Sequence, residues 1–98
     1  MAMMEISIVP IGTGQTSLSG YVASLVKIVE GSGLDFELHD MGTVVQGEID
    51  ELFALAHEMH QALWVHEVKR VYTVIKIDDR RDKKSSLGQK VSSVRQKL

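Results

Sequence analysis

The residues with the most obvious chemistry lie near the C-terminus, directly after a predicted strand. Residues 78–83 read Asp-Asp-Arg-Arg-Asp-Lys, so three carboxylates and three cations follow an apolar segment. The cluster could form a polar clamp for a small ligand or for a neighbouring subunit. It could equally be a solvated loop whose charges keep a sheet edge from aggregating. The two adjacent aspartates could also hold a divalent cation, but the two arginines beside them would more readily neutralise them.

A second polar segment, residues 12–17 (Gly-Thr-Gly-Gln-Thr-Ser), connects the first predicted strand to the first predicted helix. Thr16 or Ser17 could cap that helix by accepting a hydrogen bond from a free backbone N–H group. A Gly-Thr-Gly turn before a helix also resembles a phosphate cradle, because helix N-termini favour anions. The segment lacks the complete dinucleotide-binding and P-loop motifs. Both interpretations, helix cap and phosphate cradle, are open.

No set of residues predicts catalysis. The chain has no cysteine, and no serine lies in a Gly-x-Ser-x-Gly motif. None of the four histidines has an evident nucleophile partner. His57 and His60 lie three residues apart on a predicted helix, a spacing that could hold a metal, but no third ligand lies at a matching position. We therefore predict a protein that is not an enzyme and that uses no metal or other cofactor.

The hydrophobic pattern predicts the elements that position these residues. Alternating apolar residues predict strands at residues 4–11, 34–41, 42–47 and 70–77. Apolar residues spaced three and four apart predict helices over residues 18–29 and 48–65. Ser86 and Gln89 have the form of a capping box, which predicts a short helix after them. Glycines at 31 and 33 end the first helix.

This order of elements predicts an α+β fold. It is a ferredoxin-like βαββαβ sandwich with a four-stranded antiparallel sheet and an extra C-terminal helix, in a single domain over residues 1–98. Both long helices should cover one face of the sheet. The opposite face would be semi-polar, which suits a subunit interface or a ligand floor better than bare solvent. The short last helix is marginal in isolation and should dock on its own domain or on a second copy.

The same patterns predict which residues form the core. In the strands, the residues expected on the helix side are Met4, Ile6, Ile8, Phe36, Leu38, Val71, Thr73, Ile75 and Ile77. In the second helix, the expected core stripe is Ile49, Leu52, Phe53, Ala56, Met59 and Leu63. Trp64 and His60 flank this stripe and should meet a loop or a partner.

Composition narrows the classes of function. The chain has 98 residues and a formal net charge of −2 at pH 7, so a general nucleic-acid surface is not expected. No uncharged apolar stretch reaches the roughly 18 residues that a membrane span needs. The first residues, Met-Ala-Met-Met-Glu-Ile, do not have the pattern of a signal peptide. We predict a cytoplasmic protein with no membrane or nucleic-acid partner.

Four segments have the residues, order and spacing of a known family: residues 8–13, 16–22, 41–43 and 71–82. On these segments, and over essentially its whole length, the chain resembles the small thiamine-binding proteins, the YkoF-like family. The resemblance implies a ferredoxin-like fold, a cytoplasmic location and a homodimer or homotetramer. It also implies binding of thiamine or of a pyrimidine precursor, its hydroxymethylpyrimidine part.

Such a ligand needs hydrogen-bonding groups at its edge and a flat apolar wall. The cationic thiazolium ring of thiamine favours a carboxylate or an aromatic face, whereas a phosphate ester favours Arg80, Arg81 or Lys76. The charged loop carries both positive and negative side chains, so the ligand could be neutral, cationic or phosphorylated. An anion could also bind near Arg80 and Arg81. The predicted ligand-binding residues are Thr13, Thr16, Ser17, Thr43, Gln46, Tyr72, Asp79 and Arg80.

Three functions are therefore considered. The first, which we favour, is a small-molecule binding protein for thiamine or its hydroxymethylpyrimidine moiety that works as a homo-oligomer. The second is a regulatory or assembly module with no dedicated ligand. The third is an enzyme that acts on a small metabolite at a subunit interface.

Overall fold

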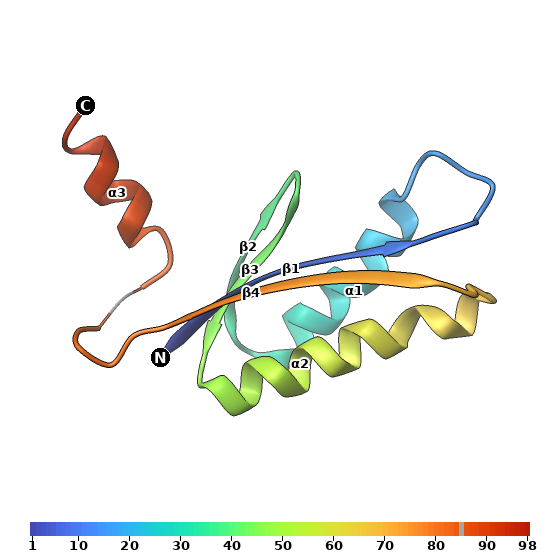
Figure 1. Ribbon diagram of the computed structural model, residues 1–98, viewed down its shortest axis with the longest axis horizontal. Helices are drawn as coiled ribbons and strands as arrows, with labels where there is room; N and C mark the ends of the chain where they lie inside the picture. The colour runs from blue at the N-terminus through green and yellow to red at the C-terminus, as the bar shows by residue number, and fades with distance from the viewer. Residues whose placement is uncertain (85) are drawn as a thin grey trace.

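The computed structural model describes residues 1–84 and 86–98. Its elements are β1 (Ala2–Pro10), α1 (Ser19–Ser32), β2 (Asp35–His39), β3 (Gly42–Gly47), α2 (Ile49–Ala62), the 3₁₀ helix η1 (Leu63–His66), β4 (Val71–Asp79) and α3 (Gln89–Arg95). The strands form one antiparallel sheet in the order β2-β3-β1-β4, with α1 and α2 on the same side of it (Figure 1). The predicted ferredoxin-like α+β fold is confirmed. None of the helices in the described residues is long and apolar enough to cross a membrane.

The central strand β1 has partners of unequal length. It pairs with β4 along its whole length, from the Ala2–Asp79 pair to the Pro10–Val71 pair. It pairs with β3 only from Ala2–Gly47 to Ile6–Thr43. Residues 7–10 of β1 therefore extend past the end of β3, and one side of this segment has no strand beside it.

Peptide groups alternate in direction along an antiparallel strand. The N–H of Ile11 donates to the carbonyl of Arg70 at 2.9 Å, and this bond fixes the alternation. Odd-numbered residues of β1 face β4, and even-numbered residues face β3. In β4, even-numbered residues face β1 and odd-numbered residues face the free edge of the sheet. Pro10, which has no N–H, lies at an even position past the end of β3, where no donor is needed.

The core lies between the sheet and the two long helices. Burial alternates along β1, so its even-numbered residues are buried against the helices and its intervening residues are half-buried on the opposite face. The buried apolar residues are Ala2, Met4, Ile6, Ile8, Leu25, Val29, Val45, Leu52, Leu55, Ala56, Met59 and Leu63. Neither α1 nor α2 covers the opposite face, as predicted (Figure 1).

Three residues predicted for the core are instead exposed. Leu38, Phe53 and Ile75 have exposed fractions of 54%, 55% and 41%. Leu38 and Ile75 do lie on the helix side, because both share a row of the sheet with Ile6. They belong to the two edge strands, where the helices give less cover. Phe53 lies on a flank of α2 and not in its buried stripe.

The helix caps also differ from the prediction. Neither Thr16 nor Ser17 caps α1: its N-cap residue is Leu18, without a side-chain hydrogen bond. The Ser17 hydroxyl lies 3.4 Å from that of Ser19. Gly33 closes α1 with a left-handed φ of 75°, as predicted, whereas Gly31 lies within the helix.

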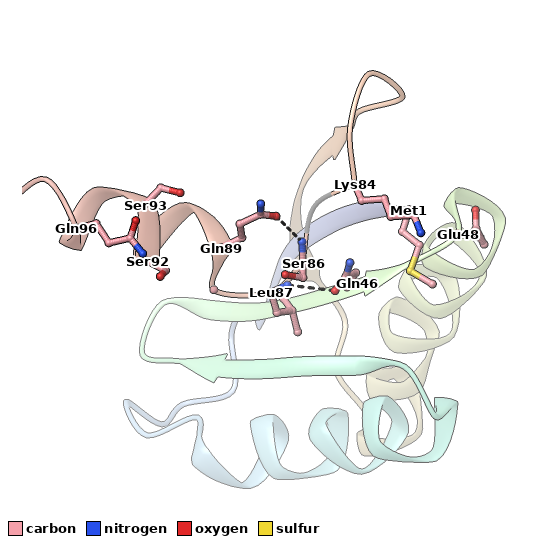
Figure 2. Close-up of a pocket in the computed structure, with 11 residues that line it drawn as sticks. Met1, Gln46, Glu48, Lys84, Ser86, Leu87, Gln89, Ser92, Ser93 and Gln96 are labelled. Carbon is pink, nitrogen blue, oxygen red and sulfur yellow. Dashed lines mark hydrogen bonds between the residues drawn. The ribbon is translucent and has the colours of Figure 1, made fainter.

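The capping box predicted for the last helix forms only in part. The Gln89 side chain accepts the N–H of Ser86 at 3.0 Å, but the N-cap residue is Gly88 and makes no side-chain bond. α3 extends away from the sheet and meets it near its first turn (Figures 1 and 2). Leu87 N–H donates to Gln46 Oε1 at 3.1 Å, and Lys90 pairs with Asp78. None of the α3 residues, all of which the structure describes, is buried.

Candidate ligand site

A cavity of about 230 Å³ lies between α1, the β2–β3 hairpin and the part of β1 that extends past β3. We call it the hairpin cavity. Its apolar lining comes mainly from Ile6, Ile8, Val9, Leu18, Val22, Leu25, Leu38 and Met59, and the remaining lining residues are Ser7, His39, Asp40, Met41, Gly42 and Thr43.

Thr43 places a hydroxyl in this cavity. Thr43 is only 6% exposed. Within the described residues, the Thr43 Oγ1 atom makes no hydrogen bond. Every side-chain oxygen or nitrogen that is fully buried in those residues does have a partner. The hydroxyl must therefore keep some accessible surface, and the cavity that Thr43 lines provides it. A ligand in the cavity could therefore reach this hydroxyl, and a ligand that excluded water from it without bonding it would lose about 1–3 kcal/mol.

The main chain of β1 adds a donor and an acceptor. Ile8 is at an even position, so its N–H and C=O face the β3 side, but the ladder with β3 ends at Ile6–Thr43. The peptide groups of Ile8 thus have no partner in β3 and open toward the cavity that Ile8 lines. A donor and an acceptor on one residue can bind a flat ring that presents the complementary pair of groups.

The hairpin turn forms the rim of the cavity. His39, Asp40 and Met41 line it and are exposed. A Cβ at Gly42 would lie 3.1 Å from the carbonyl oxygen of Ile6, so glycine allows the hairpin to approach β1 closely. His39 Nε2 lies 3.4 Å from the Glu37 carboxylate.

Of the eight predicted ligand-binding residues, Thr43 lines the hairpin cavity. Thr13, Thr16 and Ser17 lie in the connection between β1 and α1. Thr13 Oγ1 accepts the N–H of Gln15 at 3.3 Å, which closes a local turn. Ser17 lines a separate cavity of about 420 Å³ with Tyr21.

Gln46 and Tyr72 lie elsewhere. Gln46 is near the far end of β3, in an open groove of about 1090 Å³ that includes Met1, Glu48 and residues around α3 (Figure 2). Tyr72 is on the semi-polar face of β4 and is 57% exposed. It aligns with Val9 across the β1–β4 pair. The structure thus separates these two residues from Thr43.

Asp79 and Arg80 lie together in a groove of about 380 Å³ at the end of β4. Arg80 donates from Nε to Asp82 Oδ1 at 2.8 Å and from Nη2 to Asp82 Oδ2 at 2.5 Å. This side-chain hydrogen bonding lowers the pKa of Asp82 to about 2. Arg81 Nη2 lies 3.7 Å from the carboxylate of Asp79. An anion at Arg80 or Arg81 would therefore compete with these carboxylates.

Sequence reasoning missed the Ile8 peptide and most of the cavity wall, including Ser7 and Val22. One signal could have found them. The alternating pattern of the first strand spans residues 4–11, whereas the third predicted strand spans only residues 42–47. Strands of unequal length leave part of the longer one unpaired, and such a segment offers free backbone groups.

Other proteins are similar in sequence and in fold. UPF0045 protein YqgV of Bacillus subtilis is 42% identical over 102 residues, which cover 100% of this chain and 98% of the relative. A UPF0045 protein of Methanothermobacter thermautotrophicus is 40% identical over the whole of both chains. The crystal structure of MJ1052 from Methanocaldococcus jannaschii matches with a TM-score of 0.85 at 33% identity and covers 95% of this chain and 94% of the other.

A further structure shows the fold at lower identity. A candidate thiamine biosynthesis/salvage protein from Thermotoga maritima matches with a TM-score of 0.80 at 22% identity, covering 95% of this chain and 97% of the other. Residues 4–95 match the family model described as thiamine-binding protein. This range includes all of β1 except its first two residues and every later element through α3. The chain therefore belongs to the thiamine-binding protein family.

Proposed function

We propose that this protein binds thiamine or its hydroxymethylpyrimidine moiety in the hairpin cavity, works as a homo-oligomer and catalyses no reaction. The observation that carries the proposal is the Thr43 hydroxyl, which lacks a partner among the described residues inside a largely apolar cavity. Membership of the thiamine-binding protein family supports the class of ligand. The name of the Thermotoga maritima protein, which refers to thiamine biosynthesis or salvage, agrees with it.

The size of the cavity favours one ring over two. Its volume of about 230 Å³ is below the range of about 300–1,000 Å³ that is common for small-molecule pockets. The aminopyrimidine would lie against Val22 and Leu25. Its ring nitrogen and amino group would bond the N–H and C=O of Ile8, and Thr43 would bond a further edge atom. The cationic thiazolium would stay at the rim, where the Asp40 carboxylate attracts it.

The test is a calorimetric titration with thiamine, hydroxymethylpyrimidine and the phosphate ester of each. Thr43→Val keeps the shape of the side chain and removes the hydroxyl, so we expect binding to weaken by about 3- to 10-fold, the value of one hydrogen bond. Thr43→Ser restores the hydroxyl and should recover most of the affinity. Unfolding temperatures of the two variants show whether the fold is kept.

Two outcomes would contradict the proposal. One is the absence of both heat and a rise in melting temperature with all four ligands, because a ligand at a hundred times its Kd stabilises by about 2.7 kcal/mol. The other is unchanged affinity in Thr43→Val, which would place the ligand outside the hairpin cavity.

The second candidate function, an assembly module without a ligand, is favoured by α3. Its apolar residues Val91 and Val94 are 53% and 59% exposed. A helix of seven residues is too short to be stable alone, so a second copy would be its natural support. Self-association is common to both candidates, and the titration separates them.

A further inference from the structure

We propose that the hairpin cavity selects an alcohol over its phosphate ester, and that the Asp40 carboxylate in the hairpin turn sets this preference. The preference concerns the ligand of the proposed function and rests on that function. Its physical basis is the charge on the cavity wall. Among the described residues that line the cavity, Asp40 is a carboxylate and none is a lysine or an arginine. The wall therefore offers a phosphate group no cation.

Asp40 lies unpaired at the mouth of the cavity. It and Met41 form the turn between the paired residues His39 and Gly42. Within the part of the chain that the structure describes, its carboxylate makes no hydrogen bond or ion pair. His39 also lines the cavity, but its Nε2 lies 3.4 Å from the Glu37 carboxylate. A protonated His39 would be balanced by Glu37, so Asp40 decides the sign of the charge at the mouth.

Other cations of the sheet lie away from this mouth. Arg70 and Lys76 belong to β4 or directly precede it, on the far side of β1 from the cavity. Lys76 also pairs with Glu5 at 3.6 Å. The groove at the end of β4 lies beside the Ala2 end of β1, about 20 Å from Ile8 in an extended strand. Its cationic side chains are Arg80, Arg81, Lys83 and Lys84.

Arg95 of α3 lies near the hairpin but on its other face. It lines a groove of about 520 Å³ together with Glu37 and His39. Successive side chains of a strand point to opposite faces of the sheet. Glu37 and His39 therefore lie on the semi-polar face, whereas Leu38 faces the hairpin cavity. β2 thus separates Arg95 from a ring bound in the cavity, and Arg95 shares its groove with a carboxylate.

The N-terminus of α1 does not open into the hairpin cavity. Such a terminus would favour a phosphate group. α1 and its N-cap contribute the apolar side chains of Leu18, Val22 and Leu25 to the wall. The first residues of the helix, Ser19 and Gly20, line the separate cavity of about 420 Å³. The free N–H groups at the start of α1 therefore do not offset the charge of Asp40.

The size of the cavity keeps a phosphate group at the mouth. A cavity of about 230 Å³ holds one ring and little more. In hydroxymethylpyrimidine phosphate, a single methylene carbon separates the ring from the ester oxygen, so the phosphate would lie beside Asp40. A phosphate monoester carries a charge of about −1.5 to −2 at pH 7. At about 6 Å, each unit of like charge weakens binding by between about 3-fold and about 100-fold, depending on screening by water.

The phosphate of thiamine phosphate would lie farther from Asp40. The thiazolium ring and its hydroxyethyl chain separate it from the pyrimidine, and the positive charge of the thiazolium offsets part of the repulsion. The cavity should therefore discriminate more strongly between hydroxymethylpyrimidine and its phosphate than between thiamine and its phosphate.

The experiment is a calorimetric titration of wild type and Asp40→Asn with these four compounds. Wild type should bind hydroxymethylpyrimidine at least about 10-fold more tightly than its phosphate, with a smaller ratio for thiamine. Asp40→Asn removes the charge and keeps the shape, and asparagine suits a turn. It should weaken the binding of thiamine by about 3- to 10-fold and strengthen that of hydroxymethylpyrimidine phosphate by a similar factor. Hydroxymethylpyrimidine, uncharged at neutral pH, is the reference ligand in each variant.

Two further variants test the assignment to Asp40. Asp35→Asn makes the same change of charge at an exposed position at the other end of β2, and it should leave every ratio unchanged. Arg95→Ala should leave the affinity for both phosphates unchanged. A loss of phosphate binding in Arg95→Ala would place the ester on the outer face of the hairpin and contradict the proposal. Unfolding temperatures show whether each variant keeps its fold.

The selection and the proposed function fail in different ways. If wild type binds hydroxymethylpyrimidine phosphate as tightly as the alcohol, the selection is refuted and the proposed function stands. If the alcohol is preferred but Asp40→Asn leaves the ratio unchanged, the role of Asp40 is refuted. If none of the four compounds binds to wild type, the proposed function is refuted and the selection with it.

Discussion

The charged residues at the end of β4 already form ion pairs with one another in the absence of a ligand. Arg80 holds the carboxylate of Asp82 with two hydrogen bonds, and Arg81 lies near Asp79. The alternating charges of this loop therefore neutralise one another over short sequence distances. This arrangement suits the solvated loop that the sequence allowed. An anion near Arg80 and Arg81 stays a prediction, since it would have to displace these partners.

The Asp82 carboxyl gives a direct test of this pairing. Its pKa is lowered from the ordinary 3.8 to about 2, first by the Arg80 hydrogen bond. A lowered pKa means that the ion pair contributes to stability above pH 3.8, and that the contribution is lost as the pH falls toward 2. Arg80→Ala should raise the pKa of Asp82 toward its ordinary value, measured by carbon NMR of the carboxyl group. An unchanged titration would show that Arg80 is not its partner.

Among the residues of the hairpin cavity, Thr43 was predicted because it lies in a segment that resembles the family and offers a hydroxyl to the edge of the implied ligand. The peptide groups of Ile8 could not be predicted from the sequence, because a backbone group is free only where its partner strand has ended. Leu18 and Val22 were expected only as part of a helix stripe. The structure shows that both also line the cavity.

At the scale of elements, prediction succeeded where neighbours lie on both sides. β1 shows regular alternation of buried and half-buried residues, since it lies between β3 and β4. β4 has the same kind of sequence pattern, yet most of its residues are exposed. α2 does not cover the whole apolar face of β4. The alternation of apolar residues in the sequence therefore could not reveal which strand lies at an edge of the sheet.

The exposed stripe of α3 makes a prediction at this scale. If α3 docks on a second copy, Val94→Asp should lower the sedimentation coefficient of the protein, because it places a charge in the docked surface. Since Val94 is 59% exposed in the single chain, thermal stability of the monomer should change by no more than about 0.5 kcal/mol. Ser93→Asp adds the same charge beside the stripe and is the matched control. Equal sedimentation of Val94→Asp and wild type would exclude α3 from any interface.

For the whole molecule, the order of elements was enough to predict the topology, because a ferredoxin-like sandwich is the common solution for two crossovers over one sheet. The surfaces that contact a second copy could not be predicted from the sequence in the same way. That depends on which strand ends at an edge and on which way its peptide groups face, and both follow from register.

Hydrogen exchange offers a test of the sheet register without any substitution. The amides of Thr73 and Ile75 face the free edge, whereas those of Val74 and Lys76 bond to β1. The first pair should therefore exchange rapidly and the second pair slowly. Equal protection of all four amides would contradict this alternation.

The unequal edges of the sheet have a consequence for how far assembly can proceed. Past β3, the exposed side of β1 is interrupted by Pro10, and the opposite edge strand β2 has only five residues, among them Asp35, Glu37 and His39. Neither edge invites another strand. Open-ended growth by strand addition needs a permissive edge on both sides of a sheet, so it would stop at a closed particle. Concentrated solutions should then stay clear and free of fibres.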